Sequence, residues 1–224
     1  MRRAEESGYS AIVVTLDTTL PGYRPRDLRR GYLPFLQGLG LANFRTDDAF
    51  LGSLSRSQRN ASDPIVQGFL ETCFAPALSW HDIADVLEST SLPVLIKGIL
   101  DPEDAKIARD HGAEGIVVSN HGGRQVDGAI AALDALPSIV DAVGNDVAVL
   151  LDSGVRSGAD IVKALSIGAT ATLIGRPFAY ALGVGGQAAV AHLMRQLLAE
   201  VDLTLALSGY QSVGGLGPAS VVEA

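Results

Sequence analysis

Five short apolar runs, rich in β-branched residues, recur along the chain, and each ends in glycine or polar residues. They occupy residues 11–16, 93–96, 115–119, 147–151 and 171–174. Runs of this length bounded by turn residues are typical of strands buried on both faces of a parallel sheet. Helices are predicted between the later runs, over residues 101–111, 130–143 and 158–167, and after the last run, over 187–207. Strands that alternate with helices at this spacing predict parallel βαβ units.

The segment between the first and second runs breaks this alternation. Residues 18–62 are rich in Gly, Pro, Arg, Ser and Asp. A stretch this long without clear periodicity is predicted to be an irregular lid or insertion loop. Two helices are predicted after it, over 63–75 and 79–89, and the residues at the start of the second, Ser79 and Asp82, resemble a capping box.

Polar residues follow all five predicted strands. They are Thr15 and Asp17, Lys97, the turn around His121, Asp152 with Arg156, and Arg176. A β/α barrel builds its active site from the loops that follow its strands, whereas a doubly wound sheet concentrates its chemistry at one switch point. The pattern therefore predicts the α/β class and an incomplete (β/α)8 TIM barrel, with residues 1–224 as a single partial barrel domain and 208–224 as a mobile tail.

The third predicted strand ends in a turn that carries one histidine and one arginine. Ser119, His121 and Arg124 lie in this turn together with Gly122 and Gly123. An imidazole changes its charge near neutral pH, a guanidinium fork matches a carboxylate, and the glycines allow a sharp bend close to a ligand. The turn predicts a site for an acidic substrate, and the alternative is a polar turn with a solvated histidine.

The last two turns combine glycines and arginines immediately before predicted helices. The first contains Asp152, Gly154 and Arg156, and the second contains Gly175 and Arg176. Backbone N–H groups at a helix N-terminus together with arginines favour a bound phosphate. Barrels place such a site after strands seven and eight, so the five strands are expected to be strands four to eight.

Composition excludes several classes of function. The chain has 224 residues, 47% of them hydrophobic, and a net charge of −8 without a basic block, which disfavours nucleic acid and anionic membranes as partners. No apolar run is long enough to span a bilayer, and the amino end lacks the apolar core of a secretory signal. No His, Cys and carboxylate cluster has metal-ligand spacing. We expect a cytoplasmic protein without a metal.

Three single residues have simpler interpretations when each is taken alone. Lys97 could be a solvated charge at a strand end, and Asp17 could be a turn former. Cys73 is the one cysteine of the chain, which rules out an internal disulfide, and we expect it to be a small core residue rather than a nucleophile.

The motifs together resemble the FMN-dependent α-hydroxy acid oxidase and dehydrogenase family. The resemblance runs from about Arg3 to Gln211. Its most specific parts are residues 95–98, 119–125, 152–156, 175–177 and 203–209, and residues 15–35 are most similar to the lactate 2-monooxygenase branch. In that family the first three barrel strands carry further contacts to flavin and substrate. The resemblance therefore implies that this chain is truncated at its amino end.

The resemblance implies a role for each candidate residue. His121 is the catalytic base, and Asp17 stabilises its imidazolium. Arg124 and Arg24 bind the substrate carboxylate. The residues implied in binding FMN are Thr15, Lys97, Ser119, Asp152, Gly154, Arg156, Gly175 and Arg176. The reaction implied is oxidation of a lactate-like L-2-hydroxy acid to the 2-oxo acid or its oxidative decarboxylation product, and oxygen or another acceptor then reoxidises the flavin.

Two alternatives remain at the level of the sequence. The chain could be an inactive fragment that serves at most as a packing or interaction domain, or it could be an FMN-dependent isomerase on the same barrel. His121 with Arg124 and Arg24 favours acid oxidation over isomerisation. The resemblance also implies a homo-oligomer, a tetramer or octamer in the family.

Overall fold

Residues 1–74 and 76–222 are described by a computed structural model, in which the chain divides into two compact units. The larger unit comprises Met1–Asp17 and Ser79–Ala224, and the smaller unit comprises Thr18–Leu78. That both units belong to a single partial barrel domain stays a prediction.

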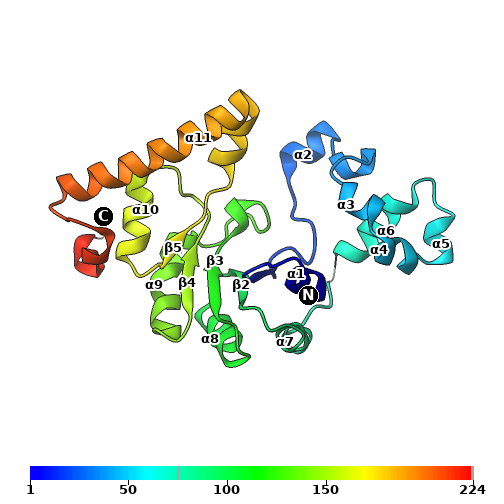
Figure 1. Cartoon of the computed structure of the whole chain (residues 1–224), viewed down its shortest axis with the longest axis horizontal. Coiled ribbons are helices and arrows are strands. Elements are labelled where there is room, and N and C mark those ends of the chain that lie inside the picture. Colours follow the sequence, from blue (N-terminus) through cyan, green and yellow to red (C-terminus); the bar gives the residue numbers. More distant parts are fainter. Residues whose placement is uncertain (75, 223–224) are drawn as a thin grey trace. The chain divides into compact units, whose positions relative to one another are not determined.

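The larger unit is built on a five-stranded parallel sheet (Figure 1). Its strands are β1 (Ile12–Thr15), β2 (Val94–Ile99), β3 (Gly115–Val118), β4 (Ala148–Leu151) and β5 (Ala171–Thr172). They pair in the order β1-β2-β3-β4-β5, so neighbours in the sequence are neighbours in the sheet. The α/β class and the five predicted parallel strands are confirmed. Because the carboxyl ends of parallel strands lie on one edge, the polar residues that follow them are brought to one rim.

The second strand continues further than its apolar run predicted. Thr15 pairs with Lys97 and Lys97 with Val117, and an irregularity then shifts the pairing so that Ile99 faces Val118. Gly98 lies within this irregularity at φ 103°, and a Cβ there would approach the side chain of Asp17 to 2.7 Å. Glycine at this position allows the bulge and the close approach of Asp17 to β2.

The core lies around the central strand β3 and its neighbours β2 and β4. All four residues of β3 are buried, as the run of apolar residues predicted. Helices α8 (Pro102–Asp110) and α9 (Ala132–Val143) pack on each other and against these strands. Leu136 and Ile139 on α9 are completely buried in this core. Burial of one such side chain stabilises the folded state by about 1.5–3 kcal/mol relative to leaving it exposed to water.

Helix α1 (Arg2–Glu6) precedes β1 in the sequence, and helix α7 (Trp80–Glu88) precedes β2. The predicted capping box at the start of α7 is confirmed, since the Asp82 carboxylate accepts hydrogen bonds from the Ser79 N–H at 2.8 Å and from the Ser79 hydroxyl at 2.6 Å. An aspartate at this position therefore performs the part of the usual glutamate.

The carboxyl part consists of α10 (Gly158–Ser166), which packs on the long helix α11 (Arg176–Leu207), and two short 3-10 helices, η3 (Val213–Gly215) and η4 (Pro218–Ser220). Helix α11 begins eleven residues before its predicted start and is broken at Gly185 and Gly186, where glycine flexibility ended the helical periodicity. No helix among the described residues, α11 included, is both long and apolar enough to cross a membrane. Mobility of the tail stays a prediction.

The smaller unit corrects the expectation of an irregular loop. Its helix α6 (Pro64–Cys73) confirms the helix predicted over 63–75, of which residue 75 lies outside the described residues. Over residues 18–62, however, it contains short helices in place of the predicted loop, namely α2 (Pro25–Arg30), η1 (Pro34–Gln37), α3 (Ala42–Thr46), α4 (Asp48–Ser53) and α5 (Arg56–Arg59). Most have only one to two turns, too few for a hydrophobic period to be recognised. Side-chain caps from Asp47, Ser55 and Asp63 support them. A role of this unit as a lid stays a prediction.

Aromatic rings form the interior of the smaller unit. Phe44 packs edge-on against Phe50 and Phe69, and Phe35 packs at a tilt against Phe69. Such pairs add about 0.5–1.5 kcal/mol each beyond the area that they bury. Cys73 is the last residue of α6 and is exposed, so the expectation that it is a core residue was wrong.

Candidate active site

Lys97 of β2 and the segments after β3, β4 and β5 surround a cavity of about 540 Å³ on the rim of the sheet. The residues that line it include Lys97, His121, Arg124, Asp152, Gly154, Arg156, Gly175 and Arg176. Most of the residues that the resemblance assigned to substrate and cofactor thus meet at one place. We call this cavity the rim pocket.

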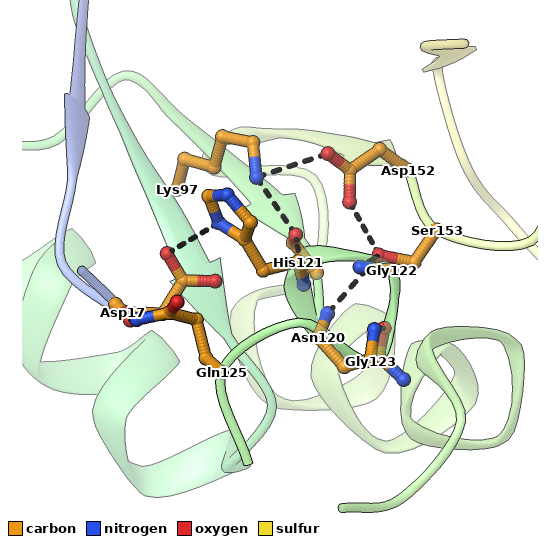
Figure 2. A network of polar contacts seen from close by, with 10 residues as sticks. Asp17, Lys97, Asn120, His121, Gly122, Gly123, Gln125, Asp152 and Ser153 are labelled. Atoms are coloured by element: carbon orange, nitrogen blue, oxygen red, sulfur yellow. Dashed lines mark hydrogen bonds and ion pairs between the residues drawn. The ribbon is translucent and has the colours of Figure 1, made fainter. Parts of the chain in front are cut away.

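His121 pairs with a carboxylate from a distant part of the sequence (Figure 2). Its Nδ1 lies 3.1 Å from Oδ1 of Asp17, which follows β1. The Asp17 backbone carbonyl accepts a hydrogen bond from the Gln125 amide at 2.6 Å, which ties the segment after β1 to the segment after β3. Since a carboxylate only accepts, Nδ1 carries the proton and Nε2 is the basic nitrogen of the neutral ring.

The other oxygen of Asp17, Oδ2, is buried and has no hydrogen-bond partner within the described part of the chain. A buried carboxylate with an unsatisfied oxygen is stabilised by a nearby positive charge. His121 is the residue whose protonation supplies that charge at 3.1 Å. The pair is therefore arranged to stabilise an imidazolium.

Lys97 forms a second polar pair across the central strand. Its Nζ lies 2.9 Å from Oδ2 of Asp152 and donates to the Ser119 hydroxyl at 2.8 Å. The side chains of Lys97 and Asp152 are each 18% exposed, so the pair is partly shielded from water. It holds an ammonium group at the wall of the rim pocket, where it can stabilise negative charge on a ligand.

The turn that carries His121, residues 119–124, has an unusual backbone, and we call it the histidine turn. His121, Gly122 and Gly123 have φ of 56°, 65° and 69°, three successive residues in the left-handed region. For a residue with a Cβ this conformation costs about 1–2 kcal/mol, so neighbouring groups must hold the turn. Asn120 does so from within, because its side-chain oxygen accepts from the Gly123 N–H at 3.1 Å and its amide donates to the Ile130 carbonyl.

Contacts from two further residues hold the same turn. The Ser119 hydroxyl accepts from the His121 N–H at 3.1 Å. Arg176 donates from Nη2 to the Gly122 carbonyl at 2.7 Å. Arg176 therefore connects the first turn of α11 to the histidine turn, in addition to lining the rim pocket.

The arginines and the helix N-terminus that line the rim pocket fit a phosphate. Arg156 and Arg176 supply two guanidinium groups, and Gly175 caps the N-terminus of α11. Guanidinium groups and helix N-termini bind phosphate by charge-assisted hydrogen bonds. Together with Lys97, which also lines the pocket, these residues fit FMN, which carries a phosphate at one end and gains negative charge on its ring when reduced.

The loop before α10 is fixed by Asp160. Burial raises the pKa of this carboxyl, but hydrogen bonds from the Arg156 and Ser157 N–H groups and the Ser157 hydroxyl outweigh it and hold the pKa below its usual range. The ionised carboxylate thereby fixes the backbone of Arg156.

Three predicted residues of the larger unit do not line the rim pocket. Ser119 and Asp17 contact Lys97 and His121 from behind, and Thr15 lies at the end of β1 beside Lys97 in the sheet register. Arg24 immediately precedes α2 in the smaller unit, and its role as a substrate ligand stays a prediction. The roles assigned to the other residues are likewise predictions, which the geometry supports.

Sequence reasoning gave no role to two residues of the network. The Gln125 amide donates a hydrogen bond to the Asp17 carbonyl, and the Ser153 hydroxyl accepts hydrogen bonds from two N–H groups of the histidine turn. The signal for Ser153 was its place between Asp152 and Gly154, in the turn after a predicted strand. Gln125 gave no signal beyond its position at the end of the 119–125 motif. Among the described residues there is no group of three or more His, Cys, Asp or Glu that could hold a metal ion.

Comparison with known proteins identifies the class. The family described as FMN-dependent dehydrogenase matches residues 1–223, and the chain belongs to this family. FMN is its cofactor, and the resemblance noted from the motifs is confirmed. The assignment to a lactate 2-monooxygenase branch stays a prediction.

Individual relatives are similar over nearly the whole chain. An L-lactate oxidase of Lysinibacillus sphaericus is 45% identical over 221 residues, which are 99% of this chain and 56% of the relative. An L-lactate dehydrogenase of Pseudomonas paraeruginosa is 39% identical over 239 residues, which are 100% of this chain and 62% of the relative. The crystal structure of mandelate oxidase with (S)-2-phenylpropionate matches with a TM-score of 0.75 and 41% identity, over 95% of this chain and 55% of that one.

These matches define the architecture. The five-stranded sheet is part of a (β/α)8 barrel, as the strand-end pattern predicted. The chain spans a little more than half the length of the relatives that it matches.

Proposed function

We propose that the rim pocket serves the FMN-dependent oxidation of a lactate-like L-2-hydroxy acid to the 2-oxo acid or its oxidative decarboxylation product. The observation that carries this proposal is the pairing of His121 with Asp17 at 3.1 Å, on the same rim as Lys97 and the two arginines of the phosphate site. A base, a cation for the flavin ring and a phosphate site are the three parts that such a reaction needs.

His121 is the base of the reaction. Oxidation of a 2-hydroxy acid removes two electrons and two protons, and a basic Nε2 accepts one of those protons from the substrate. Asp17 orients the ring through Nδ1 and stabilises the positive charge that the ring acquires. The left-handed turn places the imidazole at the wall of the rim pocket, within the same cavity as Arg124.

Binding and orientation fall to the cationic residues. Arg124 holds the substrate carboxylate through its planar fork, and Arg24 is proposed as a second ligand of the same group. Arg156 and Arg176 bind the cofactor phosphate, and Lys97 stabilises negative charge on the ring. FMN, when bound, supplies the two-electron acceptor.

We further propose that bound FMN would pass its electrons to oxygen or another acceptor. We also propose that the protein is cytoplasmic and assembles as a homo-oligomer. An interaction or packing domain without activity is the second candidate, and it is favoured by the fact that the chain covers 56% of the lactate oxidase that it matches.

A chimera separates these two candidates. Residues 1–224 replace the matching 56% of the L-lactate oxidase of Lysinibacillus sphaericus, whose remaining part completes the barrel. We expect the chimera to purify with bound FMN and to lose its flavin absorbance when L-lactate is added without oxygen. A chimera that binds FMN but stays oxidised with L-lactate, L-mandelate and glycolate would support the second candidate.

A further inference from the structure

Ser153 lies immediately after Asp152, in the loop between β4 and α10. Its φ is 71°, and among the described residues only Ser153 and His121 have a positive φ without being glycine. Glycine is the residue that adopts this conformation without a steric penalty. A serine that keeps its side chain here must gain something from its hydroxyl group.

The hydroxyl makes three hydrogen bonds (Figure 2). Oγ accepts from the Asn120 N–H at 3.2 Å and from the Gly122 N–H at 2.9 Å, and it donates to Oδ1 of Asp152 at 2.8 Å. A hydroxyl has one donor and two acceptor positions, so all of its capacity is used. Neither glycine nor alanine can make any of these contacts.

The two accepted bonds act on the residues around His121. Gly122 donates its N–H to Ser153, while its carbonyl accepts from Arg176 at 2.7 Å. The peptides on both sides of Gly122 are therefore held from two different loops. Because His121 lies between Asn120 and Gly122, Ser153 holds the backbone on both sides of the base.

The donated bond acts on the second polar pair. Asp152 has one oxygen bonded to Ser153 and the other 2.9 Å from Nζ of Lys97. Ser153 thus fixes the orientation of the carboxylate that holds the lysine. Through one hydroxyl, the base and the cation of the rim pocket are kept in a fixed relation.

We propose that Ser153 is a positioning residue, whose hydroxyl fixes the histidine turn against the Asp152–Lys97 pair at the expense of a strained backbone. The role of the Ser153 hydroxyl in holding the histidine turn does not depend on the flavin. Only the expected effect of Ser153 on turnover rests on the proposed function.

Two substitutions separate the hydroxyl from the backbone strain. Ser153→Ala removes the hydroxyl and keeps a Cβ in the left-handed region, whereas Ser153→Gly removes the hydroxyl and relieves the strain. Ser138→Ala is the matched control, because the Ser138 hydroxyl donates only to the Ala135 carbonyl within α9.

The first measurement is amide hydrogen exchange of residues 1–224 without FMN. In both Ser153 variants we expect the Asn120 and Gly122 amides to lose about tenfold or more of their protection. The Asp160 N–H, which donates to Ser157, is the internal reference, and Ser138→Ala should leave all three amides unchanged.

Thermal unfolding distinguishes positioning from a general loss of stability. We expect Ser153→Gly to melt at a higher temperature than Ser153→Ala, because glycine is unstrained at φ 71°. Exchange at Asn120 and Gly122 should nevertheless be equally fast in the two variants. If Ser153→Gly restored the wild-type exchange, or if neither variant changed it, the proposal would be overturned.

The third measurement tests the effect on turnover in the FMN-loaded chimera. We expect either substitution to slow L-lactate-driven flavin reduction by about tenfold, with the FMN affinity unchanged within about threefold. Unchanged reduction in variants with fast amide exchange would overturn the effect on turnover. A wild-type chimera that is not reduced would instead overturn the proposed function, while the exchange result would still decide whether the hydroxyl holds the histidine turn.

Discussion

His121 combines a reactive side chain with a left-handed backbone, at φ 56°. The sequence could indicate the first property, because a histidine in a glycine-rich turn after a buried strand is typical of a β/α active site. It could not indicate the second, since backbone strain depends on hydrogen bonds from residues far away in the sequence. Those bonds come from Ser153 and Arg176, which follow other strands.

The pairing of His121 with Asp17 gives the first prediction. Asp17→Asn in the FMN-loaded chimera keeps a polar group beside Nδ1 but removes the negative charge that stabilises the imidazolium. We expect L-lactate-driven flavin reduction to slow by about 10²-fold or more, as is typical when a base loses its support. Rapid mixing followed by absorbance measures the rate, and unchanged FMN content is the control. A rate within a few-fold of wild type would show that Asp17 serves the fold alone.

Arg124 gives a prediction about binding. Arg124→Lys keeps the positive charge but loses the planar fork that matches a carboxylate. We expect the dissociation constant of oxalate, measured by perturbation of the flavin spectrum, to rise by about tenfold with FMN content unchanged. Parallel loss of FMN would assign Arg124 to the cofactor or the fold instead.

At the level of elements, the short apolar runs were predictable as strands, whereas the short helices over residues 18–62 were not predictable. The strands β3 and β4 were predicted to within one residue, because their alternation with periodic helices is strong. β2 was predicted too short, since Lys97 and Gly98 do not look like strand residues, although Gly98 allows the bulge beside Asp17. The short helices of the smaller unit depend on side-chain caps and on phenylalanine packing, and neither feature produces a hydrophobic period that can be recognised in the sequence.

The start of α10 gives a prediction about stability and pH. Since hydrogen bonds lower the pKa of Asp160, its carboxylate stabilises the folded state at pH values above its unfolded pKa, and this contribution is lost as the pH falls through the lower folded value. We expect Asp160→Asn to lower the unfolding temperature at pH 5 to 8, and the difference from wild type to shrink below about pH 4. Calorimetry across this range tests it; a difference that grows on acidification would contradict it.

At the scale of the whole molecule, the sheet has two ends. In the described structure β1 pairs only with β2, and β5 pairs only with β4. Apolar side chains are exposed at both edges: Val13 on β1 is 52% exposed and Leu173 after β5 is 39% exposed. A closed barrel has no edges, whereas open parallel edges with exposed apolar residues promote association.

Residues 1–224 on their own should therefore self-associate. We expect light scattering after size exclusion to give species larger than the 23.3 kDa monomer, and we expect little bound FMN. Joining the same residues to the complementary part of the lactate oxidase should suppress non-specific association, because the edges are then paired. A monodisperse 23.3 kDa species would show that the open edges do not cause association.

The proposed role of His121 as the base of an FMN-dependent 2-hydroxy acid oxidation can be measured in the FMN-loaded chimera. The rate of L-lactate-driven flavin reduction is compared between the chimera and its His121→Gln variant. We expect both proteins to be yellow and the variant to be reduced about 10²–10⁴-fold more slowly. Reduction of the variant within a few-fold of the wild-type rate would show that His121 is not the base.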